Sequence, residues 1–455
     1  MVTMNLSIKN NNNGVVVNFN KEKFAVKYPE DIWRNFPDEM KDFFMDNYLF
    51  LNSVHIPLIL DVKNLRLDTA PPLLKSFFLA MQFMDIPSIS DFDGLKTEDV
   101  LKKFLNSSFK FNNDQVKYPN SDLNINDNTA VLSSSFGKDS LLSLAIMKEI
   151  NMDSHPIWVE EKGSPLENTY KRKLIKKFKQ DFDINIEKIN NDMILLHSYH
   201  YLKISDERNY ILSHLLTEYA FLLIPFIHNY GAEHIFFGNE QSCNESYIGK
   251  NGYKCYPVFD QSVIWMQEIN KLLNIVIGKN VHVSSLVEPL HDMAIIKILH
   301  DRYPKFAKYQ YSCFPDETSV NNFKRWCCHC SKCARLYIIF KALNINTKKL
   351  GFPNGMLSNK HMQHYSIFGQ NQNMSTYDSC GIGRDEQLLA FLLATRNKVK
   401  GELIDEFKKR FMKDVVSRED ELIKKFFNVH KSITIPKKIK SKILPIYREE
   451  LSDYI

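Results

Sequence analysis

The order of apolar and polar residues divides the chain into three parts, of which the middle part has the clearest pattern. From residue 129 onward, short apolar runs alternate with longer segments of helical period, which indicates an α/β layer with a parallel sheet. The apolar runs predict strands at residues 129–132, 156–159, 184–189, 234–237 and 281–284. The segments between them predict helices at residues 140–150, 168–182, 207–228 and 263–277. We therefore expect an α/β domain over residues 126–345.

The two flanking parts follow other patterns. The N-terminal part has strand-like runs at residues 15–19, 24–28 and 54–60, a helical stretch at 72–83, and a polar segment at 112–128 that predicts a linker. After about residue 350, helical patterns recur at residues 386–395, 401–411 and 418–427. The chain should thus begin with a smaller α+β domain (1–125), where we expect substrate recognition, and end in a helical segment (346–455).

Length, composition and charge fit a globular protein without a nucleic-acid partner. With 455 residues, 44% of them hydrophobic, the chain exceeds one compact core and predicts about two or three domains. Its 59 basic and 53 acidic residues are scattered, without the clustered basic face that binds nucleic acid.

Neither a membrane span nor a secretion signal is expected. The longest apolar run, residues 219–227, ends at His228 and is shorter than the ~20 residues that a membrane helix needs. Residues 1–14 are rich in asparagine and lack the basic start and apolar core of a signal peptide. These features predict a cytoplasmic protein in a reducing compartment.

Residues 130–142 have the pattern of a strand, a tight loop of small residues and the start of a helix. Backbone N–H groups and hydroxyls converge at such a helix N-terminus, where the helix dipole adds positive potential, so a phosphate or pyrophosphate can bind there. Lys138 adds a positive charge, whereas Asp139 and Ser140 can cap the helix or hold a magnesium ion. The residues expected to bind the phosphates are Ser133, Ser135, Gly137, Lys138, Asp139 and Ser140.

The loop is not a Walker A motif, because Leu132 and Asp139 stand where that motif needs glycine and serine or threonine. The segment SFGKDS at residues 135–140 resembles instead the SGGxDS motif of PP-loop ATP pyrophosphatases, with Phe136 in place of the first glycine. This resemblance implies an enzyme that cleaves ATP between its α and β phosphates. Because Phe136 cannot readily adopt a glycine-only conformation, we expect either ordinary torsions at this position or weaker ATP binding. A capped helix after a buried strand is the alternative without a ligand.

Five of the eight cysteines lie between Cys313 and Cys333, which in a reducing compartment indicates metal binding rather than disulfides. Cys327, Cys330 and Cys333 have a C-x2-C-x2-C spacing, and thirteen residues separate Cys313 from Cys327. Four thiolates from these residues would complete a tetrahedral zinc site of the closed, structural kind. We expect Cys328 to point away from it.

Three further segments extend the resemblance. Residues 238–245 read GNEQSCNE after a predicted strand, residues 285–290 read SLVEPL, and residues 378–386 read DSCGIGRDE. In order and spacing, these segments resemble the UDP-N-acetylmuramoyl-L-alanyl-L-glutamate epimerase family over residues 129–395, about 60% of the chain. Asp378 and Ser379 depart from that family's pattern at the start of the third segment. The phosphate loop and the cysteines are more distantly similar to 7-cyano-7-deazaguanine synthase.

The resemblance implies a parallel-sheet, HUP-like PP-loop core and an enzyme that uses ATP and Mg²⁺ to adenylate the terminal L-glutamate of a nucleotide-sugar peptide. The enzyme would then remove the α proton and return it on the other face. Adenylation helps this step, because the resulting carbanion is delocalised as an enolate without a second negative charge. A base and a returning acid are needed, for which the candidates are Cys380, Cys243, Glu240 and His291.

Other residues near these motifs have two interpretations each. Asn239 and Glu240 can line the nucleotide or hold magnesium, or else they cap the next helix. Arg325, Lys332 and Arg335, around the cysteines, can meet a substrate diphosphate, although solvated charge is the default interpretation for them.

Three other functions fit parts of the pattern. A ligase of the deazaguanine-synthase kind would pass the adenylate to ammonia, but those short synthases have no counterpart of residues 378–386. A PP-loop tRNA-modifying enzyme would need an RNA-binding surface, which the nearly balanced charge does not indicate. The third alternative, which Phe136 leaves open, is a non-catalytic or regulatory relative that keeps the fold and the zinc without turnover. The expected partner is a small-molecule or nucleotide-sugar peptide substrate, and the oligomeric state is left open.

Overall fold

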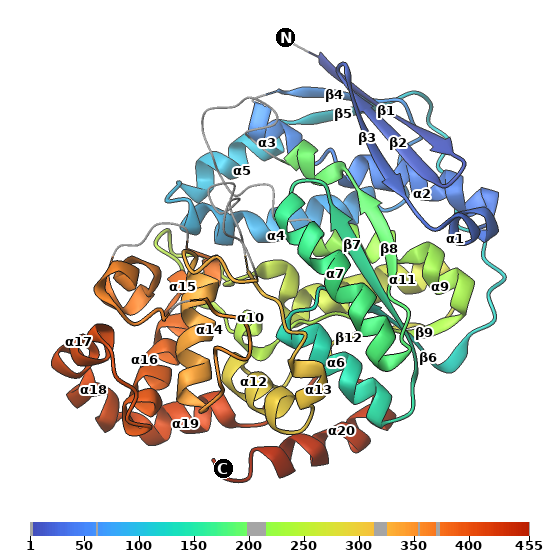
Figure 1. The fold of residues 1–455 in the computed structure, drawn as a ribbon. Helices are drawn as coiled ribbons and strands as arrows, with labels where there is room; N and C mark the ends of the chain where they lie inside the picture. Colours follow the sequence, from blue (N-terminus) through green and yellow to red (C-terminus); the bar gives the residue numbers. More distant parts are fainter. Residues whose placement is uncertain are drawn as a thin grey trace.

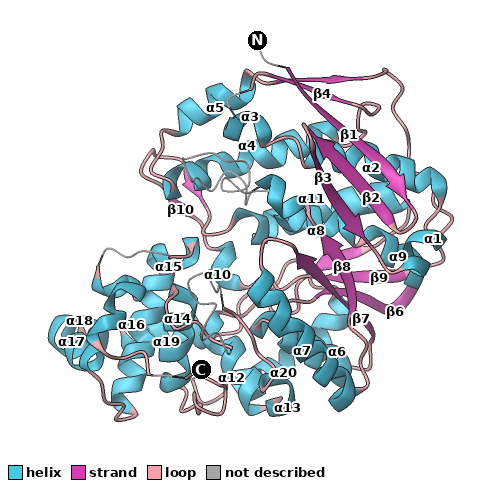
Figure 2. Ribbon diagram, turned by 45° about the horizontal axis from the view of Figure 1, so that its top comes forward, coloured by secondary structure: helices cyan, strands magenta, loops and turns pink. Residues whose placement is uncertain are grey.

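The computed structural model describes residues 3–60, 62–197, 215–313, 325–353, 355–369 and 374–454. The chain is an α/β protein built around a ten-stranded, mostly parallel sheet (Figures 1 and 2). Its strands are β1 (Thr3–Asn11), β2 (Gly14–Phe19), β3 (Glu22–Lys27), β4 (Asn64–Leu67), β5 (Ser108–Phe111), β6 (Asn126–Ser133), β7 (Asp153–Glu161), β8 (Glu187–Asn191), β9 (Ala232–Phe236) and β12 (His282–Ser284). They lie in the order β12-β9-β6-β7-β8-β3-β2-β1-β4-β5.

The five predicted core strands form a parallel set, β12-β9-β6-β7-β8, with β6 at its centre. The chain moves from β6 outward through β7 and β8, and then crosses to the other side of β6 for β9 and β12. In such a sheet the strand order reverses beside the first strand, and ligands bind in the crevice at the carboxyl ends of the strands there. The loops after β6 and β9 therefore flank the expected ligand position.

Alternating residues of β6 enter two different apolar cores. Ala130 and Leu132 are buried in a cluster that includes the C-terminal helices, whereas Val131 is buried in a cluster that includes N-terminal residues. This is the period of two that a strand imposes on its side chains. Each face of the sheet thus has its own core, and β6 belongs to both.

The N-terminal strands continue the same sheet. β3 pairs antiparallel with β8, where Val26 lies opposite Asn191, and β2 and β1 follow on its other side. Residues 112–125 have no regular structure before β6 begins. The predicted boundary at residue 125 therefore falls within a continuous sheet, and the N-terminal residues share a core with the parallel strands.

Local signals account for the bounds of helix α11 (Val263–Ile277), which agree with the helix predicted at residues 263–277. The Ser262 hydroxyl accepts a hydrogen bond from the Trp265 N–H at the helix start. Gly278, with a φ of 67°, ends the helix in the left-handed conformation.

Two predicted elements differ from the structure. The extended run predicted at residues 54–60 is wrong, because helix α3 (Ile56–Leu60) forms there. The run is almost entirely buried, so its apolar residues carry no alternation that separates strand from helix. The helix predicted at residues 207–228 is instead two helices, α8 (Leu215–Leu222) and α9 (Ile224–Tyr230), because Pro225 lies in the first turn of the second one and lacks the N–H that a continuous helix needs there. Residues 207–214 lie outside the described residues.

The C-terminal helices gather at the end of the molecule away from β1 and β4 (Figure 1). They are α16 (Gly381–Arg396), α17 (Glu402–Arg410), α18 (Met412–Ser417), α19 (Glu419–Phe427) and α20 (Lys437–Glu450), and α16, α17 and α19 match the three predicted helices. The unpredicted α20 returns to the core, where the Tyr447 hydroxyl donates a hydrogen bond to the Leu286 carbonyl (2.7 Å). Across the described part of the chain, every helix is too short or too polar to cross a bilayer.

A buried network of acids and tyrosines joins an N-terminal helix to the core. Glu218, on α8, accepts hydrogen bonds from the Tyr48 hydroxyl of α2 (Asp38–Leu51; 2.5 Å) and from the Asn191 amide (3.0 Å). Glu161, at the end of β7, accepts one from the Tyr219 hydroxyl (2.6 Å). Burial raises the pKa of both glutamates to about 7, despite the opposing effect of these hydrogen bonds.

We expect a Glu218→Gln variant to lose stability less steeply than the wild type as the pH rises from about 5 to 8. Because folding raises the pKa of Glu218 from 4.5 to about 7, its contribution to stability is present below pH 4.5 and is lost as the pH rises through 7. Glutamine keeps the acceptor for Tyr48 and cannot ionise. Guanidinium unfolding at several pH values gives the slope of the free energy of unfolding against pH for the variant and for the wild type. Glu39→Gln, at an exposed position, is the control. Equal slopes for Glu218→Gln and the wild type would contradict the raised pKa.

Candidate functional site

The predicted phosphate loop forms a closed turn between β6 and α6 (Lys138–Glu149). The Ser140 hydroxyl accepts a hydrogen bond from the Ser135 N–H (3.3 Å) and donates one to the Gly137 carbonyl (3.3 Å). The Ser135 hydroxyl accepts a hydrogen bond from the Gly137 N–H (3.2 Å). Ser133 is half-buried at the end of β6. The residues predicted to bind phosphate therefore also hold the loop in shape.

Phe136 adopts the left-handed backbone conformation, with a φ of 61°. The alternative of ordinary torsions at this position is therefore wrong. This conformation costs a non-glycine residue roughly 1–2 kcal/mol. The phenyl ring is fully buried against Phe178, and the Phe136 carbonyl accepts a hydrogen bond from the Tyr311 N–H (2.7 Å). Packing of the ring thus stabilises a backbone conformation that glycine adopts more readily than phenylalanine.

Lys138 lies among three carboxylates of separate segments. Its ammonium is 2.5 Å from Asp292, 2.7 Å from Asp139 and 3.2 Å from Glu240. Asp139 is at the start of α6, Glu240 precedes α10 (Gln241–Asn244), and Asp292 begins α12 (Asp292–Asp301). Gly238 permits this meeting, because a Cβ at that position would lie only 2.7 Å from the Asp139 Cβ.

Burial and neighbouring charges set the protonation of this group. Burial raises the pKa of Glu240 well above its usual value, and Asp292 adds to the effect. Burial acts in the same direction on Asp292, but Lys138 and Arg335 outweigh it and hold the pKa of Asp292 well below its usual range. Burial also raises the pKa of Asp139, which Lys138 partly offsets. Asp292 is therefore the most strongly ionised of the three acids, and Glu240 retains a proton more readily.

The same three acids have the chemistry of a magnesium site. One oxygen from each of Asp139, Glu240 and Asp292 lies within 4.8 Å of the others. Magnesium binds carboxylate oxygens at about 2.1 Å in octahedral geometry, which places its ligands roughly 3–4 Å apart. The three oxygens are therefore close enough to one another to hold one such ion together.

The segment at residues 378–386 meets this group from the side of α14 (Ser331–Ala342). On that helix, the Nε atom of Arg335 lies 3.4 Å from both Asp292 and Asp378. Its guanidinium carbon lies 4.6 Å from the centre of the Tyr377 ring, and the Tyr377 hydroxyl donates a hydrogen bond to Glu386 (2.6 Å). Three motifs that are distant in the sequence thus meet at one buried set of charges.

Cys380 and Cys243, two of the candidates for proton transfer, have pKa values that are raised, not lowered as a thiolate near a helix start would require. Cys380 is buried directly before α16, where its thiol donates to the Tyr377 carbonyl (2.9 Å). Burial raises the pKa of Cys380 by more than the N–H groups at the helix start lower it. Burial likewise raises the pKa of Cys243, helped by the charge of Glu240. Both residues are therefore neutral thiols near pH 7.

Two other candidates lie at the edge of the charged group. His291 is buried before α12, with its Nδ1 atom 2.8 Å from the Ser242 hydroxyl, and burial lowers its pKa. Asn239 is buried after β9, and within the described ranges its side-chain nitrogen has no hydrogen-bond acceptor. Neither residue contacts Lys138 in the way that Glu240 does.

Asp292 was missed in the sequence, although a usable signal existed. It follows β12 as Glu240 follows β9, so both residues lie beyond the carboxyl ends of neighbouring parallel strands. Polar residues at such positions meet at one edge of the sheet. Solvated charge, the default interpretation of Arg335, is wrong, because the structure buries this side chain.

Cys313, Cys327, Cys330 and Cys333 form a buried group whose sulfurs all lie within 4.8 Å of one another, and none of the four is in a disulfide bond. The Cys313–Cys333 and Cys327–Cys333 sulfur distances are 3.6 Å and 3.8 Å. A tetrahedron with zinc–sulfur bonds of about 2.3 Å has edges of about 3.8 Å, so these four residues can bind a metal such as zinc. Cys328 lies outside the group, as predicted, with a φ of 59°.

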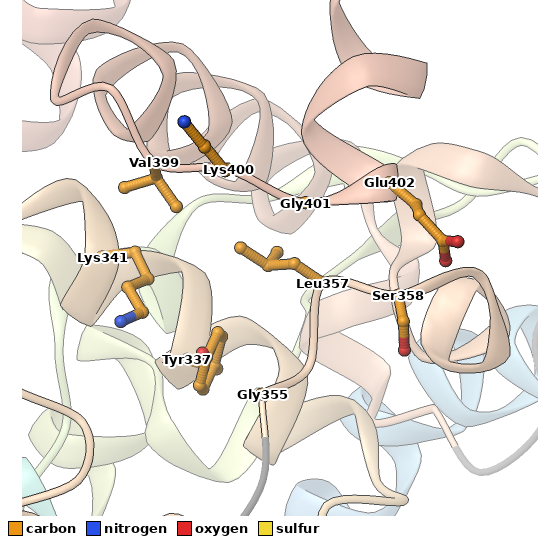
Figure 3. Close-up of a pocket in the computed structure, with 9 residues that line it drawn as sticks. All are labelled: Tyr337, Lys341, Gly355, Leu357, Ser358, Val399, Lys400, Gly401 and Glu402. Atoms are coloured by element: carbon orange, nitrogen blue, oxygen red, sulfur yellow. The ribbon is translucent and has the colours of Figure 1, made fainter.

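A cavity of about 520 Å³ lies apart from these groups, between α14 and the start of α17 (Figure 3). It is lined by Tyr337, Lys341, Gly355, Leu357, Ser358, Val399, Lys400, Gly401 and Glu402. The predicted site residues do not line it.

Comparison with known proteins adds no relative to this description. No protein-family model matches the chain, and no curated protein matches it.

We expect the order of stability wild type, then Phe136→Gly, then Phe136→Ala. Both variants lose a buried ring, at about 3–5 kcal/mol, whereas only glycine relieves the left-handed conformation, by roughly 1 kcal/mol. Guanidinium unfolding of the three proteins measures the order. An alanine variant more stable than the glycine variant would contradict the left-handed conformation of residue 136.

We expect purified Cys330→Ser protein to lose its zinc and to unfold at a lower temperature. Serine is a poor zinc ligand, and a structural zinc ion contributes directly to folding. Elemental analysis by mass spectrometry gives the zinc content, and a thermal melt gives the stability. Cys328→Ser, which changes a neighbouring buried cysteine, should keep both, so equal zinc loss in the two variants would count against the four-cysteine site.

Proposed function

We propose that the chain is a PP-loop-type enzyme that splits ATP into AMP and diphosphate while it adenylates a carboxylate, and that it then epimerises the activated substrate. The proposed substrate is the terminal glutamate of UDP-N-acetylmuramoyl-L-alanyl-L-glutamate or a related glutamyl compound. One observation carries the proposal: the motifs at residues 135–140, 238–245 and 378–386 meet in one buried group of charges. That group adjoins the loop after β6, where the strand order reverses.

The nucleotide phosphates are proposed to bind at the start of α6. There the helix dipole favours an anion, and the closed turn of Ser135, Gly137 and Ser140 presents the helix N-terminus. Asp139, Glu240 and Asp292 would hold Mg²⁺, which would offset negative charge on the leaving diphosphate. With these acids bound to the ion, the Lys138 ammonium would be released to contact a phosphate oxygen.

Adenylation prepares the substrate for the second step. An oxygen of the substrate carboxylate attacks the α phosphorus of ATP, which forms the acyl adenylate and releases diphosphate. The α C–H bond is then acidic enough for a base to remove its proton, because the negative charge spreads into the acyl group as an enolate. Cys380, a buried neutral thiol beside Tyr377, is the proposed donor of the returning proton. Hydrolysis of the adenylate finally releases AMP and the epimer.

The four cysteines are proposed to hold a structural zinc ion. All four tetrahedral positions would be filled by sulfur, so no position is left for water or substrate. Cys330 accepts a hydrogen bond from the Cys333 N–H at the start of α14, so the zinc group would fix the helix that carries Arg335.

We expect wild-type protein with ATP, Mg²⁺ and UDP-N-acetylmuramoyl-L-alanyl-L-glutamate to release diphosphate and to incorporate deuterium at the glutamate α carbon in heavy water. The Asp292→Asn variant should release diphosphate at least about 100-fold more slowly, since it removes a charge that would hold the ion. Exposed Asp414→Asn, a matched change on α18, should behave as the wild type. Diphosphate assays and chiral analysis of the glutamate give both results.

The outcomes of these assays distinguish the proposed function from the alternative functions. Release of AMP and diphosphate without deuterium exchange would keep adenylation and assign the chain to a ligase that passes the adenylate to another acceptor. Absence of both products from the wild type would contradict the epimerase assignment. An Asp292→Asn rate equal to that of the wild type would exclude this aspartate from metal binding.

A further inference from the structure

Arg335 is a buried cation with unused hydrogen-bonding capacity. Its exposed fraction is 7%, and within the described part of the chain its Nε and Nη1 atoms have no hydrogen-bond acceptor. Burying a donor without an acceptor is unfavourable, and the penalty is larger for a charged group. Such a group in a folded protein indicates an acceptor supplied from elsewhere.

The neighbours of Arg335 hold its guanidinium in position without satisfying it. Asp292 and Asp378 lie 3.4 Å from Nε, but outside hydrogen-bonding geometry. Tyr377 lies against the guanidinium. The guanidinium is therefore oriented by charge and by the aromatic ring, while the Nη1 edge keeps free donors.

Arg325 shows what a structural arginine looks like in the same region. It is buried to a similar extent, with an exposed fraction of 8%. Its Nη2 atom donates to the Lys308 carbonyl (2.8 Å), and its Nε and Nη2 atoms donate to the Gln310 carbonyl (3.1 and 2.5 Å). The contrast separates Arg335 from an arginine that only braces the fold.

Arg335 and Lys138 approach the same carboxylate from two different helices. Lys138 contacts Asp292 from α6, and Arg335 lies near the same carboxylate from α14. A second buried donor without an acceptor among the described residues, the side-chain nitrogen of Asn239, lies next to Glu240 in the chain. Unsatisfied donors are thus found around the carboxylates that would hold a metal ion.

We propose that Arg335 binds an oxyanion at this site, either a phosphate group of the nucleotide or the carboxylate that is activated. This inference rests on the proposed function and extends its binding site to α14. Both sources offer two oxygens on one atom, which matches the planar fork of a guanidinium. A divalent cation on the three acids would supply the positive charge that lets an anion approach this acidic group.

The experiment compares full-length wild type with Arg335→Met and Arg335→Lys by titration calorimetry in Mg²⁺. The probes are ATP, inorganic pyrophosphate, and UDP-N-acetylmuramoyl-L-alanyl-L-glutamate added together with a non-hydrolysable ATP analogue. Lys341→Met is the matched control, because it removes a cation from the same helix at the separate cavity of Figure 3. Zinc content and thermal melts establish whether each variant is folded. If Arg335→Met does not fold, Arg335→Lys, which keeps a buried cation, provides the test.

Arg335→Met should bind the oxyanion about 10- to 100-fold more weakly, and Arg335→Lys should recover part of the affinity because it keeps the charge but not the fork. Weaker ATP binding assigns Arg335 to the nucleotide, whereas weaker binding of the glutamyl probe alone assigns it to the carboxylate.

Unchanged affinity for all three probes, in variants of a wild type that binds ATP, overturns this inference and leaves the proposed function standing. If the wild type binds pyrophosphate but not ATP, the proposed function fails. The pyrophosphate affinities of the variants then test by themselves whether Arg335 binds an oxyanion. A wild type that binds none of the probes overturns both.

Discussion

The ion pairs of Lys138 with Asp139, Glu240 and Asp292 are the interaction on which the candidate site depends. All four side chains are largely or fully buried, and a buried charge that loses its partner is strongly destabilising. The three segments that supply the acids are therefore held together around one buried ammonium. Through Arg335 the same constraint reaches α14 and the segment around Asp378.

The features that could be predicted from the sequence have causes within a few residues. Helix α11 has both of its ends marked, by Ser262 and by Gly278, and the parallel strands are short apolar runs between polar loops. The cysteine group could be predicted because three of its four members have a C-x2-C-x2-C spacing, which is visible in the sequence whatever the fold. Lys138, Asp139 and Glu240 were found through the loops that carry them.

The features that could not be predicted depend on partners distant in the sequence. The left-handed conformation of Phe136 is held by the packing of its ring against Phe178. The loop sequence alone does not show that Phe178 lies there. The pKa values of Cys380 and Cys243 are raised by burial, which at Cys380 outweighs the N–H groups of the helix start. The sequence does not distinguish Arg335 from the other basic residues of the chain. Its role is visible only in the structure, where Asp292 and Asp378 lie beside it.

The pairing of β3 with β8 has a consequence for the way in which the chain is made. Residue 26 finds its partner only at residue 191, so during synthesis β3 leaves the ribosome long before β8 does. At about 5–20 residues per second, the interval is roughly 10–30 s. Throughout it, the N-terminal strands would present an open sheet edge that can pair with other nascent chains. The same join that makes the finished sheet continuous therefore gives the growing polypeptide a period in which it needs protection from aggregation.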